Sequence, residues 1–224
     1  MPTVALAASK GGVGKSTLCA LLGSEMAGMG LHTAILCADP QHSTWKWAER
    51  SKAAGRLNKN LTVERVDNED QLQERLGAGE KYDFILIDPQ GALNQMLALS
   101  IIASELSIVP CRASYIDAVE AVSVFNYGAN LKRANMRLVL NDVKGIDKTT
   151  GAFRDAVSAI IENKLPYFES VIQSRAVYAQ FSKDAGSLAE LATDPSKQEQ
   201  VSKAKANIAL LIKEIFTHTG TQYE

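Results

Sequence analysis

The chain has 224 residues, which is enough for one α/β domain with a sizeable buried core. Hydrophobic residues make up 46% and charged residues 22%, close to the average for globular proteins, which excludes a wholly disordered chain. The 24 Lys and Arg residues against 25 Asp and Glu residues give a net charge of −1, so any contact with DNA or an anionic membrane requires a local basic patch.

Short apolar runs alternate with segments of helical period, which is the pattern of βα units in a parallel sheet. Several runs are apolar at nearly every position, as expected when helices cover both faces of the sheet. The predicted strands, in chain order, are Thr3–Ala8, Thr33–Ala38, Leu61–Val66, Phe84–Ile87, Leu106–Pro110, Arg137–Asn141 and Tyr167–Ile172. The predicted helices include Ser16–Met29, Ser43–Ala54, Asp117–Arg133, Gly151–Asn163 and Lys203–Phe216. No Pro-, Gly- or Ser-rich linker divides the chain, so we expect a single α/β domain over residues 1–224 with a mostly parallel, doubly wound sheet of about seven strands.

Three features concern the compartment. No apolar stretch reaches the ~18 residues that span a bilayer. The start at Met1-Pro2-Thr3 lacks the basic residues and the cleavage site of a signal peptide. The three cysteines, Cys19, Cys37 and Cys111, are widely spaced and form no C-x-x-C pair, which argues against a disulfide framework or a zinc site. These features predict a cytoplasmic protein.

A glycine-rich segment stands between the first predicted strand and the first predicted helix, and it reads Ser9-Lys10-Gly11-Gly12-Val13-Gly14-Lys15-Ser16-Thr17. Glycines let the backbone N–H groups point inward, and the helix dipole adds positive potential at the same place. Lys15 can then reach the β- and γ-phosphates of a nucleotide, and the Ser16 hydroxyl can ligate Mg²⁺. A merely flexible turn would not explain the position between a strand and a helix. The segment predicts a P-loop NTPase fold in which residues 10–17 bind the nucleotide.

Two carboxylates follow apolar strands, Asp39 after Thr33–Ala38 and Asp88 after Phe84–Ile87. In an open α/β sheet the carboxyl ends of the strands lie beside the P-loop. A carboxylate there can hold the waters around Mg²⁺ or position an attacking water. One aspartate after a strand is usually a turn former or a helix cap. Two of them together with a P-loop favour Asp39 and Asp88, with Ser16, as residues of a magnesium site.

The phosphate loop departs from the general P-loop because Ser9 replaces its first glycine and Lys10 follows. This K-G-G-x-G-K-S-T form resembles that of the ParA/MinD family of ATPases, which includes plasmid and chromosome partition proteins. In that family the first lysine reaches phosphates bound by the facing subunit of an ATP-sandwich dimer. The resemblance therefore implies this role for Lys10, with Lys15 and Asp39 as further catalytic residues. It also implies ATP and Mg²⁺ as cofactors, and it makes Asp88 the Walker B aspartate, which acts on Mg²⁺ through water.

Other segments extend the resemblance to the short, ParF-like partition proteins. Asp39-Pro40-Gln41 matches the D-P-Q of switch I, whose aspartate is needed for hydrolysis, although Cys37 stands where many members carry another acid. Pro89-Gln90-Gly91 differs from the commoner switch II sequences. Asn141 and Asp142, at the end of a predicted strand, either contact adenine or form a turn.

The last predicted helix has one apolar face, formed by Val201, Ala204, Ile208, Leu211, Ile212, Ile215 and Phe216. Such a face most often docks on the domain. The tail Thr217–Glu224 is less basic than the membrane-binding tip of MinD, so no membrane partner is expected.

The resemblance implies an ATP-hydrolysing switch for plasmid or chromosome partition, with weak intrinsic turnover. The ATP-bound homodimer would bind DNA without sequence preference, and a centromere-binding, ParB-like partner would reset it. The protein would then be cytoplasmic and associated with the nucleoid when ATP is bound.

Three alternatives remain open. The same switch could position another cargo, such as a carboxysome, a chemoreceptor cluster or conjugative DNA. A P-loop phosphotransferase or synthetase would instead pass the phosphoryl group to a small substrate. An iron–sulfur reductase of the nitrogenase iron-protein kind would need paired cysteines after the Walker B region, where the sequence has only Cys111.

Overall fold

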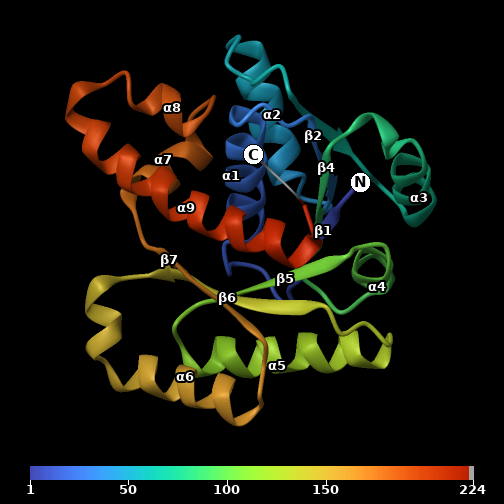
Figure 1. Cartoon of the computed structure of the whole chain (residues 1–224), viewed down its shortest axis with the longest axis vertical. Coiled ribbons are helices and arrows are strands. Elements are labelled where there is room, and N and C mark those ends of the chain that lie inside the picture. Colours follow the sequence, from blue (N-terminus) through green and yellow to red (C-terminus); the bar gives the residue numbers. More distant parts are fainter. Residues whose placement is uncertain (222–224) are drawn as a thin grey trace.

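The computed structural model describes residues 1–221, and its centre is one sheet of seven strands in the order β3-β2-β4-β1-β5-β6-β7 (Figure 1). All neighbouring strands are parallel, which confirms the predicted α/β fold. The strands are β1 (Thr3–Leu6), β2 (Thr33–Ala38), β3 (Leu61–Arg65), β4 (Phe84–Pro89), β5 (Leu106–Cys111), β6 (Met136–Val143) and β7 (Tyr167–Gln173).

Two layers of helices cover the sheet, one on each face (Figure 1). The first layer contains α1 (Lys15–Gly28), α2 (Ser43–Ala53), α7 (Ala176–Lys183), α8 (Leu188–Leu191) and α9 (Gln198–Thr219). The second contains α3 (Glu69–Gly77), α4 (Gln95–Ile102), α5 (Tyr115–Asn130) and α6 (Gly151–Glu162). Short 3₁₀ turns occupy Gly79–Lys81, Gly145–Thr149 and Pro195–Lys197.

The four central strands β1, β2, β4 and β5 are buried at every position because helices pack on both of their faces. Side chains alternate between the two layers, so that Val4 and Leu6 belong to one apolar cluster and Ala5 to another. The edge strands β3 and β7 mix buried and exposed positions. Asp88 of β4 is therefore a carboxylate inside an apolar environment, and it requires polar partners there.

Two predicted strand ends were placed two residues too early. β4 continues through Pro89, so Asp88 lies within the strand, opposite Cys37 of β2, instead of following the strand. β6 continues through Val143, so Asn141 and Asp142 are strand residues and the turn interpretation is wrong. In both cases the backbone ladder with the neighbouring strand extends beyond the apolar run, and only the run is visible in the sequence.

The predicted apolar face of the last helix is confirmed, since all seven of its residues are buried in the first layer. The helix itself begins five residues earlier and ends three residues later than the predicted Lys203–Phe216. Among residues 1–221, no helix is both long enough and apolar enough to cross a bilayer. The last three residues of the tail Thr217–Glu224 lie outside the described part of the chain.

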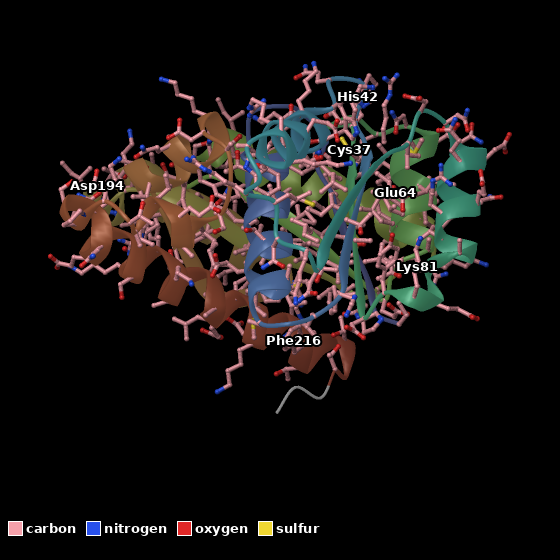
Figure 2. The ribbon with its side chains drawn as sticks, turned by 90° about the horizontal axis from the view of Figure 1, so that it is seen from above. Cys37, His42, Glu64, Lys81, Asp194 and Phe216 are labelled. Atoms are coloured by element: carbon pink, nitrogen blue, oxygen red, sulfur yellow. The ribbon has the colours of Figure 1, made fainter. Side chains whose placement is uncertain are left out.

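β2, β4 and β1 are neighbours in the parallel sheet, so the loops that follow them lie together at its carboxyl edge. Figure 2 shows Cys37, near the end of β2, and His42, in the following loop, close to this edge, with Phe216 of α9 at the opposite side of the molecule. The candidate site lies at this carboxyl edge.

Candidate functional site

The phosphate loop connects β1 to α1 and has the backbone that its glycines predict. Gly12 and Gly14 have φ values of +86° and +85°, a left-handed region that disfavours other residues. The amide of Asn141 donates to the Val13 carbonyl at 2.8 Å, and a Cβ atom on Gly14 would collide with that amide. The loop therefore leads directly into α1. The first turn of α1 holds no acidic residue, so its backbone N–H groups can bind an anion.

Lys15 and Asp88 form a buried pair beneath this loop. The Lys15 ammonium contacts the Asp88 carboxylate, and the two side chains are 6% and 0% exposed. The same carboxylate accepts hydrogen bonds from the hydroxyl of Ser16 at 3.2 Å and from that of Thr44 at 3.1 Å. These partners stabilise a charge that would otherwise be costly to bury. The structure thus brings together three residues predicted for the site and adds Thr44.

Asp39 lies near this pair and is linked to it only by a long ion pair with Lys15. Its carboxylate is 3.9 Å from the Lys15 ammonium, which is too far for a hydrogen bond, and it accepts from the backbone N–H of Gln41 at 2.8 Å. The Asp39 side chain is 15% exposed, in contrast to Asp88. It therefore retains lone pairs that face the solvent side of the site.

Lys10, at the other end of the loop, is held by α5. Its ammonium lies 2.7 Å from the carboxylate of Asp117, and the neighbouring Ser9 hydroxyl donates to the carboxylate of Glu120 at 2.6 Å. Asp117 also accepts a hydrogen bond from the hydroxyl of Ser114 at 2.8 Å. Lys10 therefore contacts neither Asp39 nor Asp88 within its own chain.

The loop after β4 closes against the phosphate loop at Gly91. A Cβ atom at Gly91 would lie 2.5 Å from the carbonyl oxygen of Lys10 and 3.1 Å from the amide nitrogen of Gly11. Only glycine permits this approach of two backbones. The two loops therefore pack backbone against backbone at this point.

Two adjoining cavities open at this edge, of about 710 Å³ and about 380 Å³, and Gly14, Thr17, Arg112 and Ser182 line both. The larger is lined by the phosphate loop, Asp39 and the loop after β4, with Lys46 and Arg50 of α2. The smaller has mainly apolar walls, and its lining includes Leu18, Leu21, Asn141, Asp142, Ile172, Arg175 and Tyr178. A polyphosphate fits the chemistry of the first cavity, and a flat base fits that of the second.

The cysteines do not resemble ligands of an iron–sulfur cluster. Cys19, Cys37 and Cys111 are free and buried. Burial raises the pKa of Cys111 to about 12, and it also raises the pKa values of the other two thiols. Cluster ligands are thiolates, so the iron–sulfur alternative finds no support among these residues.

Several contacts of the site were not predicted. Thr44 binds the predicted site residue Asp88, and Glu120 binds Ser9 beside the predicted residues, but neither stands in a motif that marks it. The hydroxyl of Ser182 lies 3.1 Å from that of Thr17, and its carbonyl accepts from the Arg50 guanidinium at 3.0 Å. No spacing rule connects residues 17, 50 and 182, so only the fold shows this contact.

The family model described as VirC1 protein matches residues 1–218. The chain belongs to the VirC1 protein family. Its sequence is 26% identical to Protein ParA of Rhizobium radiobacter over an alignment of 225 residues, which covers 96% of each chain. With the structural likenesses below, these matches place it among the P-loop ATPases of the ParA/MinD type, which act in partition or positioning.

Two solved structures have the same fold. The MinC:MinD cell division protein complex of Aquifex aeolicus gives a TM-score of 0.77 at 15% identity, covering 97% of this chain and 96% of that one. The Cyanothece McdA(D38A)-ATP complex gives a TM-score of 0.73 at 17% identity, covering 100% and 98%. At these identities the likeness confirms the P-loop NTPase fold.

Proposed function

We propose that the chain is an ATP-hydrolysing switch that partitions plasmid or chromosomal DNA. Two copies close around ATP and Mg²⁺, the closed dimer binds DNA, and hydrolysis, hastened by a centromere-binding partner, opens it again. The observation that carries the proposal is the buried Lys15–Asp88 pair beneath a crevice that adjoins a largely apolar cavity. In this arrangement the Lys15 ammonium can bind a polyphosphate, and the apolar cavity can hold a nucleotide base.

ATP binding exchanges the partner of Lys15. Without nucleotide, Asp88 neutralises the Lys15 ammonium. Phosphate oxygens at the start of α1 compete for this ammonium, and the backbone N–H groups of the loop donate hydrogen bonds to the same anion. Lys46, Arg50 and Arg112 add positive charge to the crevice wall, which favours the entry of a polyanion.

The oxygen atoms of Ser16, Asp39 and Asp88 suit Mg²⁺, which prefers hard oxygen ligands. Within residues 1–221, no group of three or more His, Cys, Asp or Glu side chains could hold a metal by itself. Mg²⁺ at a nucleotide keeps several waters and binds phosphate oxygens together with one or two protein oxygens. When bound, Mg²⁺ neutralises charge on the phosphoryl group that is transferred. Asp39, whose carboxylate makes no hydrogen bond to Lys15, orients the attacking water.

Lys10 acts on the facing copy. Its ammonium is held by Asp117 on the surface of α5, where a second chain can approach it. Transfer of this ammonium to phosphates in the facing crevice would stabilise the charge that develops during hydrolysis. Two copies that exchange lysines in this way form a symmetric dimer.

The DNA step and the cargo rest on the family. Protein ParA of Rhizobium radiobacter aligns over 96% of both chains, which supports partition as the role. A chain of net charge −1 contacts DNA through a local patch, so binding depends on phosphate contacts and on salt. The same switch would serve conjugative DNA, a carboxysome or a chemoreceptor cluster, and a neighbouring gene for a centromere-binding protein would favour partition.

The proposal is tested by measuring DNA binding and phosphate release together. Fluorescence anisotropy of a random-sequence duplex is recorded with ATP·Mg²⁺, with ADP·Mg²⁺ and without nucleotide, over a salt series. We expect binding with ATP·Mg²⁺ alone, a steep loss of affinity with salt, and ADP and phosphate as the only products. Equal DNA affinity in all three nucleotide states, or a phosphorylated metabolite as the product, would contradict the proposal.

A further inference from the structure

The first two turns of α5 present apolar side chains to solvent. Tyr115, Ile116 and Val119 are 56%, 69% and 43% exposed, and we refer to these three residues as the α5 patch. The opposite side of the helix, which includes Ala118 and Ala121, is buried against the sheet. Packing of α5 within the chain therefore does not account for the α5 patch, and neighbouring apolar side chains at a surface often mark an interaction site.

The α5 patch adjoins the outer end of the phosphate loop. At about 100° per residue, Glu120 and Asp117 follow Ile116 around the helix. These two acidic residues hold Ser9 and Lys10, at 2.6 Å and 2.7 Å. The α5 patch and the Lys10 ammonium therefore belong to one continuous surface.

We infer that the α5 patch is buried against a second copy of this chain in the ATP-bound dimer, an inference that rests on the proposed function. Lys10 reaches a facing crevice only if the facing chain approaches the residues around Lys10, and the α5 patch lies among them. In the single chain the loop engages both acidic residues, and Asp117 is released only when the Lys10 ammonium crosses to the facing chain. The apolar side chains would leave water when the copies close, which stabilises the dimer.

The test compares two isoleucines of similar exposure. Ile116→Arg places a charge in the α5 patch, whereas Ile161→Arg places the same charge near the end of α6, where Ile161 is 62% exposed. α6 ends shortly before β7 begins, so Ile161 lies at the edge of the sheet opposite the phosphate loop. Because both positions are exposed, both variants should fold, which circular dichroism checks. Val119→Ser is a milder second variant if Ile116→Arg does not fold.

Sedimentation equilibrium with ATP·Mg²⁺ gives the dimer dissociation constant, and calorimetry on dilute protein gives the ATP affinity of the single chain. We expect Ile116→Arg to weaken the dimer by at least about tenfold, with unchanged ATP affinity, and Ile161→Arg to dimerise like the wild type. Val119→Ser should weaken the dimer less than Ile116→Arg. If Ile116→Arg dimerises like the wild type while the wild type responds to ATP, the inference about the α5 patch is wrong and the proposed function stands. If the wild type itself does not dimerise, both are wrong.

Discussion

Each end of the phosphate loop carries one lysine, and the two lysines differ in their exposure and in their ion-pair partners. Lys15 is 6% exposed and its ammonium contacts a carboxylate that is fully buried in β4. Lys10 is 34% exposed and its ammonium pairs with Asp117 on the surface of α5. A buried pair fixes the position of both charges, whereas an exposed pair separates at little cost. The inner end of the loop is therefore built to hold a ligand of its own chain, and the outer end is free to act elsewhere.

Removal of the inner lysine should have the largest effect. In Lys15→Ala the bound polyphosphate loses its buried cation, and we expect a loss of about 2–5 kcal/mol in the free energy of ATP binding, measured by calorimetry. The free energy of unfolding should also fall by about 3–5 kcal/mol, because Asp88 stays buried without a cation. The double variant with Asp88→Asn serves as the control, since it should recover stability but not ATP binding. Binding of ATP by Lys15→Ala with wild-type affinity would show that the inner end is not the phosphate site.

Asp39 should separate hydrolysis from binding. Because its carboxylate is 3.9 Å from the Lys15 ammonium, too far for a hydrogen bond, Asp39→Ala should bind ATP almost normally while phosphate release falls by about 10²–10⁴-fold. The ATP-bound dimer should then accumulate. Turnover is followed by phosphate release and mass by light scattering. Normal turnover in this variant would remove Asp39 from the catalytic residues.

Gly91 brings the loop after β4 against the outer end of the phosphate loop. A methyl group there meets the backbone of Lys10 at 2.5 Å, so we expect Gly91→Ala to lower the free energy of unfolding by about 1–3 kcal/mol in urea denaturation. Gly77→Ala is the matched control, because nothing lies within 4 Å of a Cβ at this position in α3. The control should raise stability by about 0.5 kcal/mol. Equal effects of both substitutions would contradict the close contact at Gly91.

Removal of the outer lysine should affect stability least. Lys10→Ala breaks a partly exposed ion pair, which is worth about 0.2–1 kcal/mol in urea denaturation. Lys203→Ala, which breaks an exposed pair with Glu199 in α9, should change stability by a similar amount. A loss of several kcal/mol from Lys10→Ala alone would mean that Lys10 is a structural residue, like Lys15.

The sequence predicted the parts of this site that depend on neighbouring residues. The glycines and lysines of the phosphate loop are recognisable because one short segment must both turn and open a helix. Asp39 and Asp88 are recognisable because each comes at the end of an apolar run. The seven strands followed from the same apolar runs, which mark the buried centre of the sheet.

The sequence did not predict what each end of the loop contacts. Asp117 stood out only as the first residue of a predicted helix, although it lies 2.7 Å from Lys10. Gly91 and Thr44 meet the loop from segments that have no spacing relation to it. Such contacts depend on how whole helices, strands and loops pack together. The spacing of apolar residues within one element does not predict them.

The mass of the protein in solution tests the central claim that the outer lysine acts between two copies. Light scattering is recorded for the wild type, Lys10→Ala and Lys203→Ala, each with ATP·Mg²⁺ and with ADP·Mg²⁺. We expect ATP·Mg²⁺ to double the mass of the wild type and of Lys203→Ala, whereas Lys10→Ala should bind ATP and stay a single chain. The role of Lys10 between two copies would be contradicted if ATP·Mg²⁺ doubled the mass of Lys10→Ala as it does that of the wild type. It would also be contradicted if the wild type had the same mass with ATP·Mg²⁺ and with ADP·Mg²⁺.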